Sequence, residues 1–230
     1  MPNRVPIAAL LATLSLAACA DAPTATRAPL APSAAAPSSS RAAVVQTAAV
    51  AWHAQQAGLG HGGLVAGASA QLVRTANGLS YHISTSGLTP GHAYTLWLVV
   101  VNNPAACTAT PCTAPNIFSP AARGQVRFAA GHVAGASGDG AFAGAVQEGA
   151  LSGWVANRML EDASKAEVHL VINDHGPMLP EFMPNMIHSY RGGCSDASPF
   201  PGVFPATALA DGEVGPNICR LYQAAVFPAP

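Results

Sequence analysis

Histidine is the residue type with the greatest capacity for chemistry in this sequence, which contains 8 of them among 230 residues. Four occur where an imidazole could act as a ligand: His82, His169, His175 and His188. Neutral imidazoles suit copper or zinc, and the carboxylate of Asp174 could orient the ring beside it. Their spacing matches no local ligand motif, so a metal site would require the fold to bring them together. The alternative is that these side chains face solvent or form structural hydrogen bonds.

Asp174-His175-Gly176-Pro177 places a carboxylate next to a histidine. Such a pair could hold one imidazole tautomer for acid–base chemistry. The same residues are typical of a turn, because Asn173 and Asp174 accept backbone hydrogen bonds and Gly176 permits an unusual backbone angle before Pro177. The sequence favours the turn.

Other catalytic and binding classes find no support in the pattern of residues. The sequence has no Gly-x-Ser-x-Gly element of a hydrolase, and its glycine-rich segments near 58–67 and 131–144 lack the spacing of nucleotide-binding loops. With 10 basic and 11 acidic side chains and a formal net charge of −1, the chain offers no basic patch for nucleic acid. We therefore do not expect an enzyme or a nucleic-acid-binding protein.

The N-terminus is typical of an export signal. Arg4 gives a positive start, and residues 5–18 form an uncharged apolar run that is shorter than the ~20 residues needed to span a bilayer. The run ends in Leu16-Ala17-Ala18-Cys19, which resembles the lipobox of bacterial lipoproteins. The resemblance implies that residues 1–18 are a signal peptide and that a lipid on Cys19 anchors the mature chain to a membrane. An ordinary secretory signal is the alternative.

The residues after Cys19 indicate an address and a spacer. In lipoproteins, an aspartate directly after the lipidated cysteine favours retention in the inner membrane. Here Ala20 holds that place, so the resemblance implies the outer membrane of the bacterial cell envelope, if the host has one. Residues 19–44 are mostly Ala, Pro, Ser and Thr, which predicts a disordered tether. Residues 45–230 are the size of one domain.

The remaining cysteines predict two disulfides. Of the 5 cysteines, lipidation of Cys19 would leave Cys107, Cys112, Cys194 and Cys219, an even number in an exported chain. Three pairings are formally open, and we expect Cys107 to pair locally with Cys112, which leaves Cys194 with Cys219. A zinc site is the competing interpretation, but the spacing lacks the short cysteine pairs of structural zinc modules.

Strand patterns dominate residues 45–230. Residues 79–84 alternate between apolar and polar side chains, which predicts a strand with one wet face. Residues 93–101 are apolar on both faces, which predicts a central strand covered on both sides. Further strands are expected at residues 70–75, 125–130, 141–147, 166–173 and 220–227.

Many short strands separated by glycine and proline predict an all-β fold. We expect an antiparallel β-sandwich or an open barrel with at most one or two short helices. The candidate helical segments are residues 155–165, as a helix or a single helical turn, and, more weakly, the alanine-rich residues 44–56.

Several motifs together resemble a group of exported bacterial proteins that carry no known activity. The motifs are Gly87 to Trp97 (GLTPGHAYTLW), Asn102-Asn103-Pro104 followed by Cys107 and Cys112, Glu167 to Val171 with Asp174 to Pro177, and Gly192-Gly193-Cys194. The resemblance covers most of residues 75–230 and implies a β-rich envelope protein. A fainter likeness, to chordin-type β domains, lacks their paired His-x-His element and suggests only a fold.

The loop between Cys194 and Cys219 is the most promising contact surface. It carries Phe200, Val203, Phe204 and Leu209 among several prolines. Proline and the disulfide would hold these apolar groups in place at low entropic cost, which favours recognition. The alternative is that the phenylalanines plug the open end of the sandwich.

These observations together predict a non-enzymatic envelope lipoprotein domain. It would serve a structural role, or bind a small ligand or another envelope protein. The alternative is an exported copper- or zinc-binding sandwich that uses some of the four histidines named above.

Overall fold

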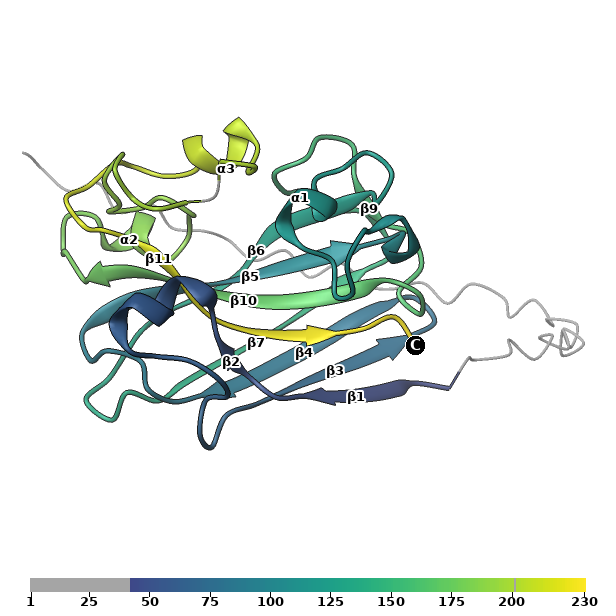
Figure 1. Cartoon of the computed structure of the whole chain (residues 1–230), viewed down its shortest axis with the longest axis horizontal. Coiled ribbons are helices and arrows are strands. Elements are labelled where there is room, and N and C mark those ends of the chain that lie inside the picture. The colour runs from purple at the N-terminus through teal and green to yellow at the C-terminus, as the bar shows by residue number, and fades with distance from the viewer. Residues whose placement is uncertain (1–41, 201) are drawn as a thin grey trace, which may run out of the picture. The chain divides into compact units, whose positions relative to one another are not determined.

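Two antiparallel sheets pack face to face in the computed structural model, which describes residues 42–200 and 202–230 (Figure 1). The first sheet has the order β1–β3–β4–β7, with bounds Val44–Ala48, Ser69–Thr75, Gly78–Thr85 and Gly140–Gln147. The second has the order β2–β11–β10–β5–β6, with bounds Ala51–Trp52, Arg220–Phe227, Glu167–Pro177, His92–Val101 and Gly124–Val133. The predicted all-β fold is confirmed, and of the two predicted architectures the structure has the sandwich rather than the open barrel. The predicted signal peptide, Cys19 and most of the tether lie outside the described residues.

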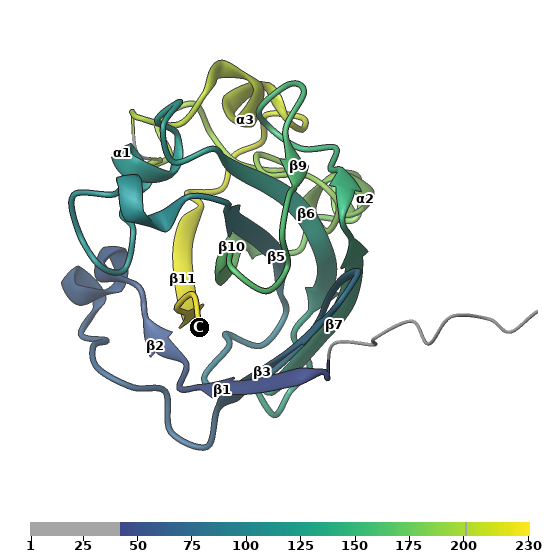
Figure 2. The same ribbon diagram turned by 90° about the vertical axis from the view of Figure 1, so that its right-hand side faces the viewer.

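The connections alternate between local hairpins and crossings from one sheet to the other. Strands β3 and β4 form a tight hairpin in which Thr75 pairs with Gly78. Strands β6 and β7 follow each other in sequence but lie in different sheets, where β6 pairs with β5 and β7 pairs with β4. Figure 2 shows the two sheets as opposite walls around the core. A two-stranded hairpin, β8 (Gly149–Ala150) with β9 (Met159–Leu160), stands outside both sheets.

The core between the sheets follows the period-two alternation of the strands. Val168, Leu170 and Ile172 of β10 are completely buried in the main core, as the alternation predicts. Leu96 and Leu98 of β5 lie in the same core.

A second apolar layer covers the outer face of the second sheet. The alternate residues of β5, Trp97, Val99 and Val101, belong to this layer. It is completed by the loops that carry α1 (Ala114–Ile117) and α3 (Ala206–Ala210). Figure 2 shows α1, α3 and β9 on the outer side of this sheet. Because β5 is covered on both faces, its sequence is apolar throughout.

The helical segments are all short. They are η1 (Ala54–Leu59), η2 (Pro104–Ala106), α1, α2 (Met183–Met186) and α3. None of the helices in the described part of the chain is long and apolar enough to cross a membrane.

Neither candidate helical segment is helical along its length. Residues 155–165 form turns around β9, and Asn157 has a positive φ of 58° that an α-helix does not accommodate. In the alanine-rich segment only η1 is helical, because residues 44–48 pair with β3 as an edge strand. Alanine permits a helix, but the tertiary pairing of the sheet overrides that weak preference.

One arginine is buried within this framework. Arg74 of β3 is 1% exposed, and its guanidinium donates hydrogen bonds to Gln46 Oε1 (2.6 Å) and to the carbonyls of Ala163 (2.7 Å), Ala166 (2.8 Å) and Pro228 (3.3 Å). Burial lowers its pKa to about 10, so it remains charged at neutral pH. Arg74 thus joins the edge strand β1, the segment before β10 and the C-terminal segment.

Candidate functional site

Two disulfides hold the loops that cover the second sheet. Cys107 is bonded to Cys112 with 5.5 Å between their Cα atoms, and Cys194 is bonded to Cys219 with 5.4 Å. The predicted pairing is therefore confirmed. The first loop is also fastened to β10, because the backbone N–H of Cys112 donates to Glu167 Oε1 over 2.8 Å.

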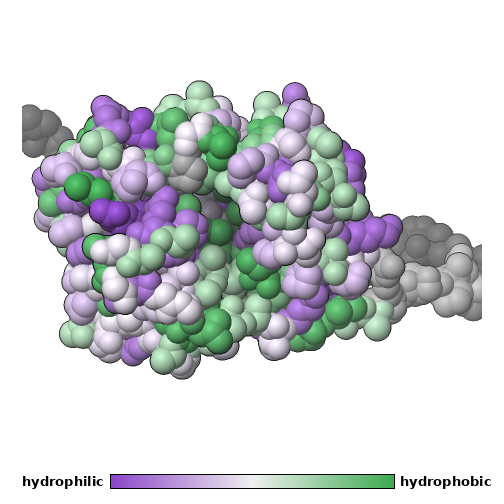
Figure 3. All heavy atoms as spheres, in the orientation of Figure 1, coloured by the Kyte–Doolittle hydropathy of each residue, from purple (hydrophilic) through white to green (hydrophobic). Residues whose placement is uncertain are grey.

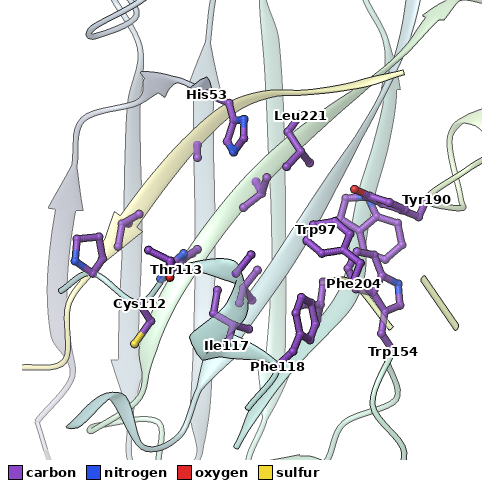
Figure 4. Close-up of a pocket in the computed structure, with 18 residues that line it drawn as sticks. His53, Trp97, Cys112, Thr113, Ile117, Phe118, Trp154, Tyr190, Phe204 and Leu221 are labelled. Atoms are coloured by element: carbon purple, nitrogen blue, oxygen red, sulfur yellow. The ribbon is translucent and has the colours of Figure 1, made fainter. Parts of the chain in front are cut away.

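A pocket of about 330 Å³ lies between the second sheet and these loops. Its floor includes Trp97 of β5, Val171 of β10 and Leu221 of β11, and its roof includes Cys112 and Ile117 (Figure 4). We call this hollow the outer pocket. Its lining also includes His53, Trp154, His169, Tyr190 and Phe204. In Figure 3 the surface is hollowed between the loop that carries α1 and strand β11, and hydrophobic side chains gather there. The volume falls within the range of small-molecule sites.

Aromatic rings form one end of the outer pocket. The ring of Tyr190 packs against Trp97 (centroids 5.4 Å apart), Trp154 (4.6 Å) and Phe204 (5.6 Å). The contacts of Tyr190 with Trp97 and Trp154 are edge-to-face, a favourable geometry for aromatic pairs. Trp97 comes from the sheet, Trp154 from the loop between β8 and β9, and Tyr190 and Phe204 from the segment between α2 and α3. The packing therefore fixes the loops relative to the sheet.

The hydroxyl of Tyr190 has no hydrogen-bond partner among the described residues. The side chain is 1% exposed, and burial raises its pKa well above the ordinary value, so the phenol is neutral. Figure 4 shows its oxygen directed toward Leu221, along the floor of the outer pocket. A buried hydroxyl without a partner costs about 1–3 kcal/mol, which a bound polar group would relieve.

His169 supplies a second polar group to the floor. Its Nε2 lies 2.7 Å from Glu167 Oε1. Burial by itself raises the pKa of Glu167, but the hydrogen bonds from His169 and from the Cys112 backbone outweigh it and the net shift is downward. Glu167 is therefore ionised at neutral pH, and as a carboxylate it accepts the hydrogen of His169 Nε2. The Nδ1 atom of His169 has no partner among the described residues and remains available to a ligand.

His53 lies on the β11 side of the outer pocket, beside Leu221 in Figure 4. It caps η1, because its Nδ1 accepts the backbone N–H of Gln55 over 3.2 Å. Burial lowers the pKa of His53 below its ordinary value of 6.5, so its ring is neutral at neutral pH. Because Nδ1 is an acceptor, Nε2 carries the hydrogen.

His175 positions the aromatic end from beneath. Its Nδ1 lies 2.8 Å from the Gly192 carbonyl, which can only accept, so Nδ1 carries the hydrogen. Its Nε2 then accepts the hydroxyl hydrogen of Thr95 over 2.8 Å. The Thr95 oxygen in turn accepts from Trp97 Nε1 over 2.8 Å. Burial, opposed by the Gly192 hydrogen bond and the charge of Asp174, lowers the pKa of His175 to about 4.

The structure does not gather the four predicted metal-binding histidines into one site. His82 is exposed on β4 of the first sheet, and His188 is exposed and stacked on Phe128 with centroids 5.4 Å apart. In the described part of the chain, the one group of three or more ligand-type side chains within reach of a common ion is His175 with Cys194 and Cys219. These two sulfurs are joined in a disulfide, so neither is a thiolate ligand.

The prediction of a turn at residues 174–177 is wrong: these residues end strand β10, where its pairing with β5 shifts register between Asp174 and Pro177. Gly176 has a positive φ of 81°, and its backbone N–H donates to Asp174 Oδ1 over 2.8 Å. The carboxylate of Asp174 pairs with His92, whose Nδ1 lies 3.0 and 3.1 Å from its two oxygens. His92 was not predicted as a partner of Asp174, because the contact depends on the register that pairs the start of β5 with the end of β10.

The proposed contact loop contributes in two ways. Phe200 and Phe204 pack inward against Tyr190, so they belong to the outer apolar layer. Leu209 is half-buried, whereas Val203 is 45% exposed. The loop therefore covers the outer face of the second sheet, and Phe204 lines the outer pocket.

No sequence motif marks Trp97, Trp154, Tyr190 or His53 as parts of a site. Of these residues only Trp97 could have been suspected from the sequence, because it alternates with the residues of β5 that face the main core and so must lie on the opposite face of the strand. Comparisons with protein-family models, with curated proteins and with solved structures found no match to this chain.

Proposed function

We propose that this protein is an envelope lipoprotein whose folded domain binds a small apolar molecule in the outer pocket. The observation that carries the proposal is the hydroxyl of Tyr190, a residue of the pocket lining, which is buried without a partner beside a mostly apolar hollow. Native proteins satisfy nearly all buried polar groups, so an unpaired one inside a cavity points to an absent ligand.

The construction of the pocket supports the same proposal. The disulfide between Cys107 and Cys112 and the hydrogen bond to Glu167 fix the roof, and the second disulfide fixes the loop that carries Phe204. A pocket already held in shape loses little entropy when a ligand binds. Export and lipid anchoring, which the N-terminal sequence implies, would place this pocket at the cell envelope.

Titration with the neutral fluorophore phenylnaphthylamine tests the proposal on the mature chain. We expect saturable fluorescence enhancement in the wild type. Val171→Phe replaces a small side chain on the floor of the outer pocket by an aromatic ring that occupies part of the space for the ligand. This variant should bind the fluorophore about tenfold or more weakly. Val73→Phe is the matched control, because Val73 is also a half-buried strand residue but lies on β3 of the first sheet.

Three results would contradict the proposal. They are the absence of saturable binding, equal loss of binding in both variants, and a wild-type dimer on size-exclusion chromatography that Val171→Phe dissociates. The last result would mean that a second copy of the chain covers the outer pocket. Thermal unfolding of each variant shows whether it is folded.

A further inference from the structure

The outer pocket has no fully charged side chain in its lining. No Lys, Arg, Asp or Glu is among the described residues that line it, and its titratable groups are His53, His169 and Tyr190. Two acidic side chains lie behind the lining, and one basic side chain, Arg127, lines a neighbouring hollow together with Trp97 and Trp154. Glu167 contacts His169, and Asp211 accepts the backbone N–H of Tyr190 over 3.3 Å.

This arrangement disfavours an anionic ligand. A carboxylate or sulfonate in the outer pocket would lose its hydration without gaining a cationic partner, and the charge of Glu167 would repel it. A cation would also lose its hydration, and it could not pair directly with Glu167, which is 2% exposed and is not part of the lining. The electrostatics therefore favour a neutral molecule.

The shape and the polar atoms narrow the class further. The floor extends over the neighbouring strands β5, β10 and β11, with strands ~4.8 Å apart, so it suits a flat molecule. The aromatic end offers ring edges and faces from Trp97, Trp154 and Tyr190 for stacking. The Tyr190 hydroxyl can donate and accept, and His169 Nδ1 is a second partner in the floor.

We infer that the ligand is a neutral, ring-bearing apolar molecule with one hydroxyl or carbonyl group that hydrogen-bonds to Tyr190. This inference rests on the proposed function and adds the chemical class of the ligand. It differs from a site for fatty acids or other organic anions, which would need a basic residue in the lining.

A set of naphthalene derivatives with one ring system and different head groups tests the inference. Equilibrium dialysis at pH 7 would compare naphthalene, naphthol, naphthoate and naphthylmethylammonium on the mature chain. We expect naphthol to bind about threefold to tenfold more tightly than naphthalene, the gain of one neutral hydrogen bond. We expect both charged compounds to bind at least about tenfold more weakly than naphthol.

Tyr190→Phe removes only the hydroxyl and keeps the ring packing. In this variant naphthol should lose its advantage over naphthalene, while naphthalene binds as in the wild type. Tighter binding of naphthoate or of the ammonium compound would overturn the neutral class, and equal binding of naphthol and naphthalene to the wild type would overturn the role of Tyr190. Both results leave the pocket itself in place, whereas failure of all four compounds to bind would refute the proposed function as well.

Discussion

The buried imidazole of His175 makes a specific prediction about how stability depends on pH. Its folded-state pKa is lowered to about 4, against 6.5 for a free histidine, chiefly because burial disfavours the charged form. Between these values the unfolded chain binds a proton that the folded chain does not. Stability therefore falls as the pH drops from about 6.5 toward 4, and the contribution is fully present above 6.5. The size of the loss is on the order of 3 kcal/mol.

Replacement of His175 by Leu removes this titration. At pH 7 the variant should be less stable, because the Thr95 hydroxyl and the Gly192 carbonyl each lose their partner, at about 1–3 kcal/mol for each group. Between pH 6.5 and pH 4, however, the variant should lose less stability than the wild type. His53 also has a lowered pKa, but its contribution is common to both proteins and cancels in the difference.

Urea unfolding at several pH values between 7 and 4, followed by tryptophan fluorescence, measures the difference. His82→Leu is the matched control, since His82 is exposed on β4 and should leave the pH dependence close to that of the wild type. If His175→Leu does not fold, His175→Gln keeps a hydrogen-bonding group that does not titrate in this range. Parallel loss of stability in the wild type and the foldable variant would refute the reasoning.

Two further predictions concern the cysteines. Replacing both Cys194 and Cys219 by Ala should cost about 3 kcal/mol of unfolding free energy, and replacing both Cys107 and Cys112 about 2 kcal/mol. The cost is larger for Cys194–Cys219 because this disulfide closes the longer loop. Urea unfolding measures the two costs, and limited proteolysis should cut the loop containing Val203 first when the longer bridge is absent; cleavage elsewhere first would contradict this. Cys19→Ser should release the protein from the membrane fraction and abolish lipid labelling, and retention of the variant in the membrane would contradict the anchor.

The main strands were predictable because their signal is local. The alternation in residues 79–84 and 166–173 reports which side chains face the core, whatever their partners. The apolar run of residues 93–101 likewise predicted a strand covered on both faces. The disulfide pairing followed from a short spacing and an even count of cysteines. The helix predictions failed because alanine-rich and loop segments carry weak local preferences that sheet pairing overrides.

The sequence by itself thus predicted an all-β fold, as a sandwich or an open barrel, and the expected pairing of its cysteines, whereas only the tertiary structure decided where a ligand could bind. His169 lies on the polar phase of its strand, yet it is 7% exposed, because loops from distant parts of the chain cover that face. Trp97, Trp154 and Tyr190 meet only when the β8–β9 loop and the segment after α2 fold back onto the second sheet. A pocket formed by contacts over such long separations leaves no periodic trace in any one segment, because its residues are selected by their positions in space.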